Sequence, residues 1–256
     1  MRSSKTLKRI RGGGLARCAN LGNPIPPYIA HAARAGFDCI WLDLEHRAFE
    51  PRELQVLMAH FRLYDIDCLL RAPTLEKTGL YRYLEDGAAG LMIPHVSTAE
   101  KARQLVQAVK FPPIGDRGID NAGFDSDYRI NPDNIAYTEW ANRETFLVVQ
   151  IETPEAVENV EEIAGVPGVD LLFVGPGDLG LRYQLAGKNP AEKLEAAYER
   201  VAAACRDHGK AWGCPSGTPE DLKKRRAQGA QLLCNCGDFM ILRDGLNAAS
   251  AMFEGL

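Results

Sequence analysis

The chain repeats one unit eight times: a short apolar run, a turn, and a stretch of helical length. Such alternation predicts parallel strands that are covered by helices. We expect strands at about 14–20, 38–43, 66–71, 89–93, 145–151, 169–174, 210–214 and 230–234. Eight such units in 256 residues fit one closed barrel, so the sequence predicts an α/β protein with a single (β/α)8 TIM-barrel domain over residues 1–256.

Two segments break this rhythm. Residues 1–13 carry five basic side chains and no acidic one. We expect them to form a frayed, solvated lead-in to the barrel, because chain ends are commonly loosely held. Residues 111–132 are rich in Pro, Gly, Asp and Asn and lack periodicity, and such long connections tend to be functional. We therefore expect this loop to lie over the barrel mouth.

Composition narrows the classes of partner. The formal net charge of -4 gives no general attraction to nucleic acid or to anionic lipid. The N-terminus lacks the apolar core of a signal peptide, and no segment is apolar enough over the length that spans a bilayer. We expect a cytoplasmic protein with no nucleic-acid or membrane partner.

The seven cysteines form an odd number in a chain too large to need disulfides for its stability. Five of them, Cys18, Cys39, Cys68, Cys214 and Cys234, fall in expected strands, where a free thiol behaves as a small hydrophobe. Cys234 and Cys236 form a C-x-C pair that could bind metal. No second Cys/His pair stands at zinc-finger spacing, so we favour a structural role.

Reactive residues collect directly after the expected strands, where barrels of this kind build their active sites. Asp43, Glu45 and His46 follow the second strand, and Arg71 ends the third. The other two groups are Gln150 with Glu152 after the fifth strand, and Gly175-Pro176-Gly177-Asp178 after the sixth. We expect all of them at one mouth.

Glu152 and Asp178 follow neighbouring strands and could converge as hard oxygen ligands for Mg²⁺ or Mn²⁺. From spacing alone, Glu152 could equally be an acid that favours the dipole of the following helix, and Asp178 a turn residue.

His46 is the best candidate for a general base, because Asp43 stands three positions away and could fix its tautomer. It could equally be a loop histidine that caps the backbone. Arg71 requires an anionic partner, either a substrate oxyanion or carboxylate, or a barrel carboxylate such as Asp43 or Glu45. His95, after the fourth strand, is a possible secondary residue of the mouth.

Five ordered motifs resemble the HpcH/HpaI aldolase family, which includes 4-hydroxy-2-oxoheptanedioate aldolase and 2-dehydro-3-deoxyglucarate aldolase. The resemblance covers nearly the whole chain. The motifs are Gly36-Phe37-Asp38 with Asp43-Leu44-Glu45-His46, Leu70-Arg71-Ala72-Pro73, Pro112-Pro113-Ile114-Gly115-Asp116-Arg117-Gly118, Gln150-Ile151-Glu152-Thr153 and Phe173-Val174-Gly175-Pro176-Gly177-Asp178-Leu179.

The resemblance implies a class II aldolase that makes or cleaves a 4-hydroxy-2-oxo acid from pyruvate, or a related 2-oxo acid, and an aldehyde. It implies a hexamer assembled as a trimer of dimers, in which the two chains of a dimer exchange their last helix. Glu152 and Asp178 would hold Mg²⁺ or Mn²⁺, with Co²⁺ or Zn²⁺ as further candidates. His46 would be the base assisted by Asp43, and Arg71 would steady the keto or enolate oxygen. The remaining substrate-binding residues would be Gln150, Gly175, Pro176 and Gly177.

The chain departs from the family pattern where we expect the aldehyde half of the substrate. Gly177 and Gly180 stand where the family usually has alanine and serine, and Ile119-Asp120-Asn121 replace small residues after Gly118. The loss of the serine should remove a hydroxyl from the mouth.

Three other functions stay open. A Schiff-base aldolase would need a lysine near the centre or C-terminal end of a strand, and Lys210 stands at the start of one. A lyase of the citrate-lyase type would act on a coenzyme A thioester and need a basic, adenine-binding surface, which we do not locate. A non-catalytic barrel that binds a metal and a 2-oxo acid would need only the carboxylates.

Overall fold

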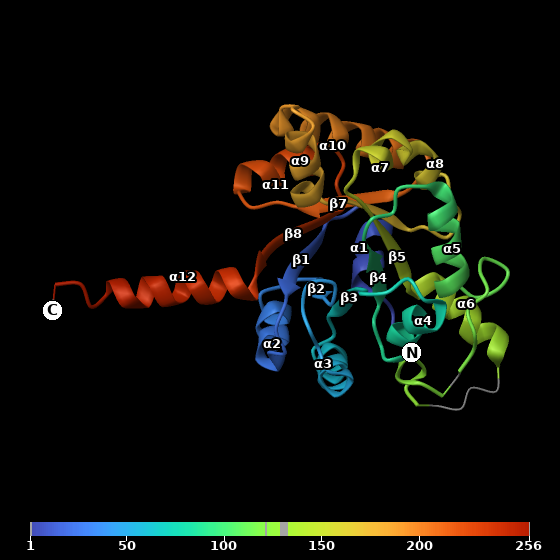
Figure 1. Ribbon diagram of the computed structural model, residues 1–256. Helices are drawn as coiled ribbons and strands as arrows, with labels where there is room; N and C mark the ends of the chain where they lie inside the picture. The colour runs from blue at the N-terminus through green and yellow to red at the C-terminus, as the bar shows by residue number, and fades with distance from the viewer. Residues whose placement is uncertain (1, 121, 129–132, 256) are drawn as a thin grey trace.

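The computed structural model describes residues 2–120, 122–128 and 133–255, and within them eight parallel strands close into a barrel in sequence order (Figure 1). The strands are β1 (Ala16–Leu21), β2 (Cys39–Asp43), β3 (Asp67–Arg71), β4 (Gly90–Ile93), β5 (Phe146–Ile151), β6 (Leu171–Val174), β7 (Ala211–Pro215) and β8 (Leu232–Gly237). The last strand pairs in parallel with the first, which closes the sheet. Every expected run forms a strand, and the predicted TIM barrel is confirmed.

Helices between the strands cover the outside of the barrel, and one further helix precedes β1 and another follows β8 (Figure 1). They are α1 (Lys5–Arg11), α2 (Pro26–Arg34), α3 (Pro51–Leu63), α4 (Lys77–Glu85), α5 (Ala99–Val109), α6 (Asn134–Glu144), α7 (Pro154–Glu158), α8 (Val160–Ala164), α9 (Pro176–Leu185), α10 (Pro190–Asp207), α11 (Pro219–Ala227) and α12 (Asp238–Ala251). The hydroxyls of Thr153 and Thr218 cap α7 and α11 by accepting backbone N–H groups, and proline follows each cap. These local signals fix where each helix leaves the mouth.

Successive strand residues face opposite sides of the sheet and fill two separate cores. One core lies inside the barrel and includes Leu69, Met92 and Val148. The other lies between strands and helices and includes Leu70 and Leu147. All seven cysteines are free, and the five expected in strands are buried there as small apolar groups.

The N-terminal segment closes the rim opposite the mouth, so the expectation of a frayed lead-in is wrong. The Ser4 hydroxyl donates to Asp67 Oδ2 at 2.6 Å, and the Thr6 N–H donates to the same oxygen at 2.8 Å. Arg2 pairs with the other oxygen of Asp67 at 2.6 Å. Leu7 is buried and packs in the core inside the barrel. A buried carboxylate at the start of β3 therefore orders this end of the chain.

The loop after α5 does not cover the mouth in its described part, which corrects the expectation for residues 111–132. The carbonyl of Phe124 accepts from Arg62, in the last turn of α3, and the Phe124 ring lies beside Gly87, just before β4. Buried Arg117 pairs with Asp125 at 3.3 Å. Helix ends that precede strands lie at the N-terminal rim, so apolar and ionic contacts hold this segment there. Residues 121 and 129–132 lie outside the described residues.

The last helix, α12, projects away from the barrel (Figure 1). Only Asp238 of this helix is buried, and the helix carries a series of exposed apolar side chains. In the described part of the chain, no helix combines the length and the apolar character that crossing a membrane requires.

Candidate active site

The mouth of the barrel holds the side chains that the sequence singles out, at the C-terminal ends of β2 to β6. Asp43 and Arg71 are the last residues of neighbouring strands and stand opposite one another in the β2–β3 register. Glu152 follows β5, and Asp178 lies in the first turn of α9, after β6. The order of the strands thus brings residues far apart in sequence to one place.

Arg71 is held by three side chains. Its Nε and Nη2 donate to the two oxygens of Asp43 at 2.9 and 2.7 Å, and its Nη1 lies 2.9 Å from Glu45 Oε2. The guanidinium also stacks over the Trp41 ring, 4.5 Å from the centroid. Of the anionic partners that the sequence allows for Arg71, the structure shows the barrel carboxylates Asp43 and Glu45. Part of its N–H fork stays unengaged by these groups and is available to a substrate oxygen.

Asp43 binds the backbone at His46 rather than its ring. Its Oδ1 accepts the N–H groups of Glu45 at 3.1 Å and His46 at 3.4 Å. Burial alone would raise the pKa of Asp43, but the hydrogen bonds and charge of Arg71, with these amides, hold it below its ordinary value. The prediction that the Asp43 carboxylate contacts the His46 imidazole is therefore wrong.

Glu45 is the carboxylate that faces the imidazole. Its Oε2 lies 3.6 Å from Nε2 of His46, whose side chain is 57% exposed. Its Oε1 lies 3.6 Å from Nε2 of His95. Together with its contact to Arg71, this places Glu45 between two histidines and a guanidinium.

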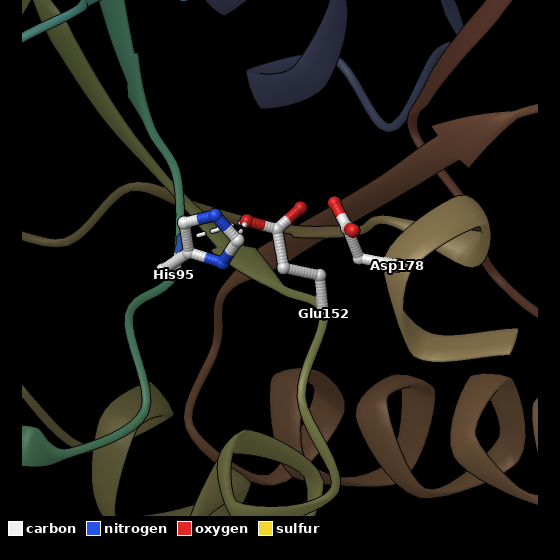
Figure 2. A group of neighbouring side chains, drawn as sticks. All are labelled: His95, Glu152 and Asp178. Carbon is white, nitrogen blue, oxygen red and sulfur yellow. Dashed lines mark hydrogen bonds and ion pairs between the residues drawn. The ribbon is translucent and has the colours of Figure 1, made fainter. Parts of the chain in front are cut away.

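Three side chains meet on the other side of the mouth: His95, Glu152 and Asp178 (Figure 2). Each offers one ligand atom, and these atoms lie within 4.8 Å of one another. The His95 N–H donates to Glu152 Oε1 at 2.6 Å, and its Nδ1 lies 3.1 Å from the same oxygen. His95 adopts a left-handed conformation with φ of 54°, which lets the backbone and the ring reach one carboxylate.

Glu152 is buried, and its charge is only partly balanced. Burial raises its pKa, the His95 N–H and ring act in the opposite direction, and the nearby carboxylates of Glu45 and Asp178 raise it further. Gln150 donates to Glu152 Oε2 at 3.2 Å, while its own buried Oε1 has no hydrogen-bond partner. Lys101 donates to the His95 carbonyl at 2.7 Å and is the ammonium group near Glu152. Two carboxylates and an imidazole so close together also fit a divalent metal ion, whose charge would relieve the remaining repulsion.

Gly175 is required by the close approach of Glu152. A Cβ at position 175 would stand 2.6 Å from Glu152 Oε2 and 2.9 Å from its Cβ. Gly177, by contrast, faces open space. A Cβ at Gly180 would meet Leu194 of α10 at 3.4 Å, so a side chain there points into helix packing rather than into the mouth. The expectation that Gly180 removes a hydroxyl from the mouth is therefore wrong.

Sequence reasoning gave His95 only a secondary place and gave Glu45 no role beyond that of a possible partner for Arg71. The available signal was their position, because each follows a strand end by two residues. The left-handed backbone of His95 has no signature in the sequence.

Comparisons with known proteins place the whole chain in one family. The family model HpcH/HpaI aldolase/citrate lyase matches residues 23–243. The hydroxypyruvate/pyruvate aldolase of Deinococcus radiodurans is 33% identical over 98% of this chain and 90% of its own length. The 2-dehydro-3,6-dideoxy-6-sulfogluconate aldolase of Pseudomonas putida is 33% identical over 86% of each chain.

Among solved structures, an HpcH/HpaI aldolase from Desulfitobacterium hafniense superposes with a TM-score of 0.90 at 30% identity, and the match covers 98% of this chain and 96% of that one. Sequence and fold therefore agree that this chain is a carbon–carbon lyase of the HpcH/HpaI aldolase/citrate lyase family.

Proposed function

We propose that the protein is a divalent-metal-dependent aldolase that cleaves or forms a 4-hydroxy-2-oxo acid from pyruvate, or a related 2-oxo acid, and an aldehyde. The observation that carries the proposal is the meeting of Glu152 and Asp178 opposite Arg71 and His46 at one mouth. The relatives that are named aldolases support the reaction class.

Glu152 and Asp178 would hold the metal, with His95 as a further neighbour. Mg²⁺ and Mn²⁺ suit a pair of carboxylates best, and an imidazole nearby also admits Co²⁺ or Zn²⁺. When bound, the ion supplies Lewis acidity toward the carboxylate and keto oxygens of a 2-oxo acid.

Arg71 supplies a fixed positive charge to the developing enolate oxygen. Asp43, Glu45 and Trp41 hold its guanidinium before substrate binds, so little reorganisation is needed during the reaction. His46 accepts the proton of the 4-hydroxyl group as the bond between C3 and C4 breaks, which leaves an aldehyde and the enolate of the 2-oxo acid. Glu45 lies beside the imidazole and orients it.

Gly175, Pro176 and Gly177 form the entry to α9 beside Glu152. N–H groups at the start of a helix attract anions, so this entry suits the carboxylate of the 2-oxo acid. Gln150 lines the same side through its contact with Glu152 and has a buried acceptor oxygen to spare.

We further propose that α12 packs against a second copy of the chain, as part of a hexamer built from dimers. Its exposed apolar residues include Phe239, Ile241, Leu242 and Leu246, each at least 49% exposed. A helix with such a surface is stabilised by burial against a partner. Light scattering of the Leu242→Lys, Leu246→Lys double variant should give a smaller species than the natural chain, and an unchanged mass would contradict the proposal.

The activity is tested by incubating the purified protein with pyruvate, Mg²⁺ or Mn²⁺ and a panel of aldehydes that includes succinic semialdehyde, tartronate semialdehyde and glycolaldehyde. Product formation should require the metal and should be lost in Glu152→Gln and His46→Gln variants. Activity that persists after EDTA treatment and is trapped by borohydride would overturn the metal mechanism. Turnover confined to coenzyme A thioesters would favour a lyase of the citrate-lyase type instead.

A further inference from the structure

A hollow of about 500 Å³ opens at the N-terminal rim, where α1 meets the start of β1 and the turn that precedes β2. Its volume falls within the range of roughly 300–1,000 Å³ that is usual for small-molecule sites. Four basic side chains line it: Lys5, Lys8 and Arg9 of α1, and Arg17 of β1. They include part of the basic N-terminal run, to which the proposed reaction gives no role.

The cations around this hollow outnumber the acids. Arg9 pairs with Asp38 at 3.0 Å, and Lys5 pairs with Asp65 at 3.0 Å. Within the described ranges, Lys8 and Arg17 have no carboxylate within ion-pair distance. Two positive charges therefore remain unbalanced in a chain whose net charge is -4.

The backbone of Arg17 is anchored, because its N–H donates to Asp38 Oδ2 at 2.9 Å. Its exposed side chain lies next to Gly36, where φ is 83°. A Cβ at position 36 would collide with Nη2 of Arg17. The glycine thus leaves room for the guanidinium beside the hollow that Arg17 lines.

By contrast, the other basic residues of the N-terminal segment already have structural partners. Arg2 binds Asp67 beneath β3, and Arg11 binds Glu144 at 3.1 Å. These pairs tie the segment to the barrel. Lys8 and Arg17 contribute no such tie, and like charges brought together without a partner destabilise a fold.

We propose that this hollow binds a small dianionic oxyanion, either a phosphoryl group or a dicarboxylate, between Lys8 and Arg17. A dianion matches the two unbalanced charges, and a guanidinium beside an ammonium suits both phosphate and carboxylate oxygens. The site lies at the opposite rim from Glu152 and Asp178, so it is separate from the proposed active site. The net negative charge of the chain favours a small anion over nucleic acid.

The test is isothermal titration of the metal-free full-length protein with inorganic phosphate and, separately, with malonate. We expect saturable binding of at least one anion at low salt, weakened several-fold when NaCl screens the charges. The Lys8→Ala, Arg17→Ala double variant should lose this binding at least tenfold. The anion that binds more tightly identifies the source of the oxyanion.

A matched control is the Arg182→Ala, Lys223→Ala double variant, which removes one exposed arginine and one exposed lysine from α9 and α11. It should bind like the natural chain. Unchanged binding in the Lys8, Arg17 variant, equal losses in both variants, or no saturable binding of either anion would overturn the proposal. Binding of an oligonucleotide alone would also overturn it. Because no readout depends on turnover, the result is independent of the aldolase activity.

Discussion

Replacing Glu45 with glutamine should lower turnover while leaving the fold intact. The side chain of Glu45 is 17% exposed, and its two oxygens face Arg71, His46 and His95. Glutamine keeps the shape and one acceptor oxygen but removes the negative charge. The imidazole of His46 then loses the carboxylate that orients it, and Arg71 retains Asp43 alone.

The size of the effect follows from these contacts. A hydrogen bond to a charged group contributes about 1.5–3 kcal/mol, and the lost bond at 2.9 Å between Glu45 and Arg71 is of this kind. If about 1.4–2.8 kcal/mol of this is expressed in the transition state, kcat falls roughly 10- to 100-fold. The KM of the 2-oxo acid should change by less than about threefold, because Glu152 and Asp178 are untouched.

Steady-state kinetics of the aldol reaction, with Mn²⁺ or Mg²⁺ saturating, provides the assay. Glu45→Asp keeps the charge and should recover part of the lost kcat. In a double variant with His46→Gln, the part of the loss that acts through the imidazole should disappear and the part that acts through Arg71 should remain, so the combined loss should be smaller than the product of the two single losses. Wild-type turnover in Glu45→Gln, or losses that multiply fully in the double variant, would refute the reasoning.

Three further changes test other parts of the structure. Gly175→Ala pushes a methyl group against Glu152 and should weaken Mn²⁺ binding roughly 10- to 100-fold in a metal titration, whereas Gly177→Ala, facing open space, should bind normally. The pKa of Asp43 is depressed, so its ionised form stabilises the fold above the unfolded-state pKa, and this stability is lost as pH falls through the folded-state pKa. Asp43→Asn should therefore cost about 1–3 kcal/mol at neutral pH, and urea titrations should show the difference shrinking in acid. Asp67→Asn, at the buried anchor of the N-terminal segment, should cost about 3 kcal/mol by the same measurement, and unchanged stability would contradict the anchoring role.

The barrel could be predicted from the sequence because its signals are local and repeated. Each strand is a run of apolar residues, and devices such as Thr153-Pro154 mark the following helix. Once the strand order is assumed, the register of β2 and β3 brings Asp43 to Arg71. The convergence of Glu152 and Asp178 follows in the same way from the pairing of β5 with β6.

The N-terminal segment and the loop after α5 could not be placed, because their anchors are contacts between residues distant in sequence. Ser4 and Thr6 are ordered by Asp67, which reads locally as an ordinary acid before an apolar strand. Phe124 packs beside Gly87, and no hydrophobic periodicity in the sequence predicts this contact. Composition predicted a frayed, solvated N-terminus and a loop over the mouth, and tertiary contacts decided otherwise.

Spacing also failed to distinguish a backbone contact from a side-chain contact. Asp43 stands three positions before His46, and a carboxylate at that distance can reach either the N–H or the imidazole. Arg71 decides the outcome, because it takes both oxygens of Asp43 and leaves only the backbone amides to share them. The imidazole of His46 therefore faces Glu45. The position of Glu45 after the strand does not by itself predict this contact.

The departures from the family pattern acquire a different meaning once they are placed. Gly180 faces Leu194 in helix packing and not the mouth. The segment that holds Ile119 and Asp120 contacts α4 through the pair of Asp116 with Lys77, and the end of α3 through Phe124 and Arg62. Gly177 stands in open space next to Asp178 in the first turn of α9, so a side chain there would not disturb the fold. Differences in aldehyde preference between this chain and its relatives should therefore be sought at Gly177 and at the strand ends of the mouth.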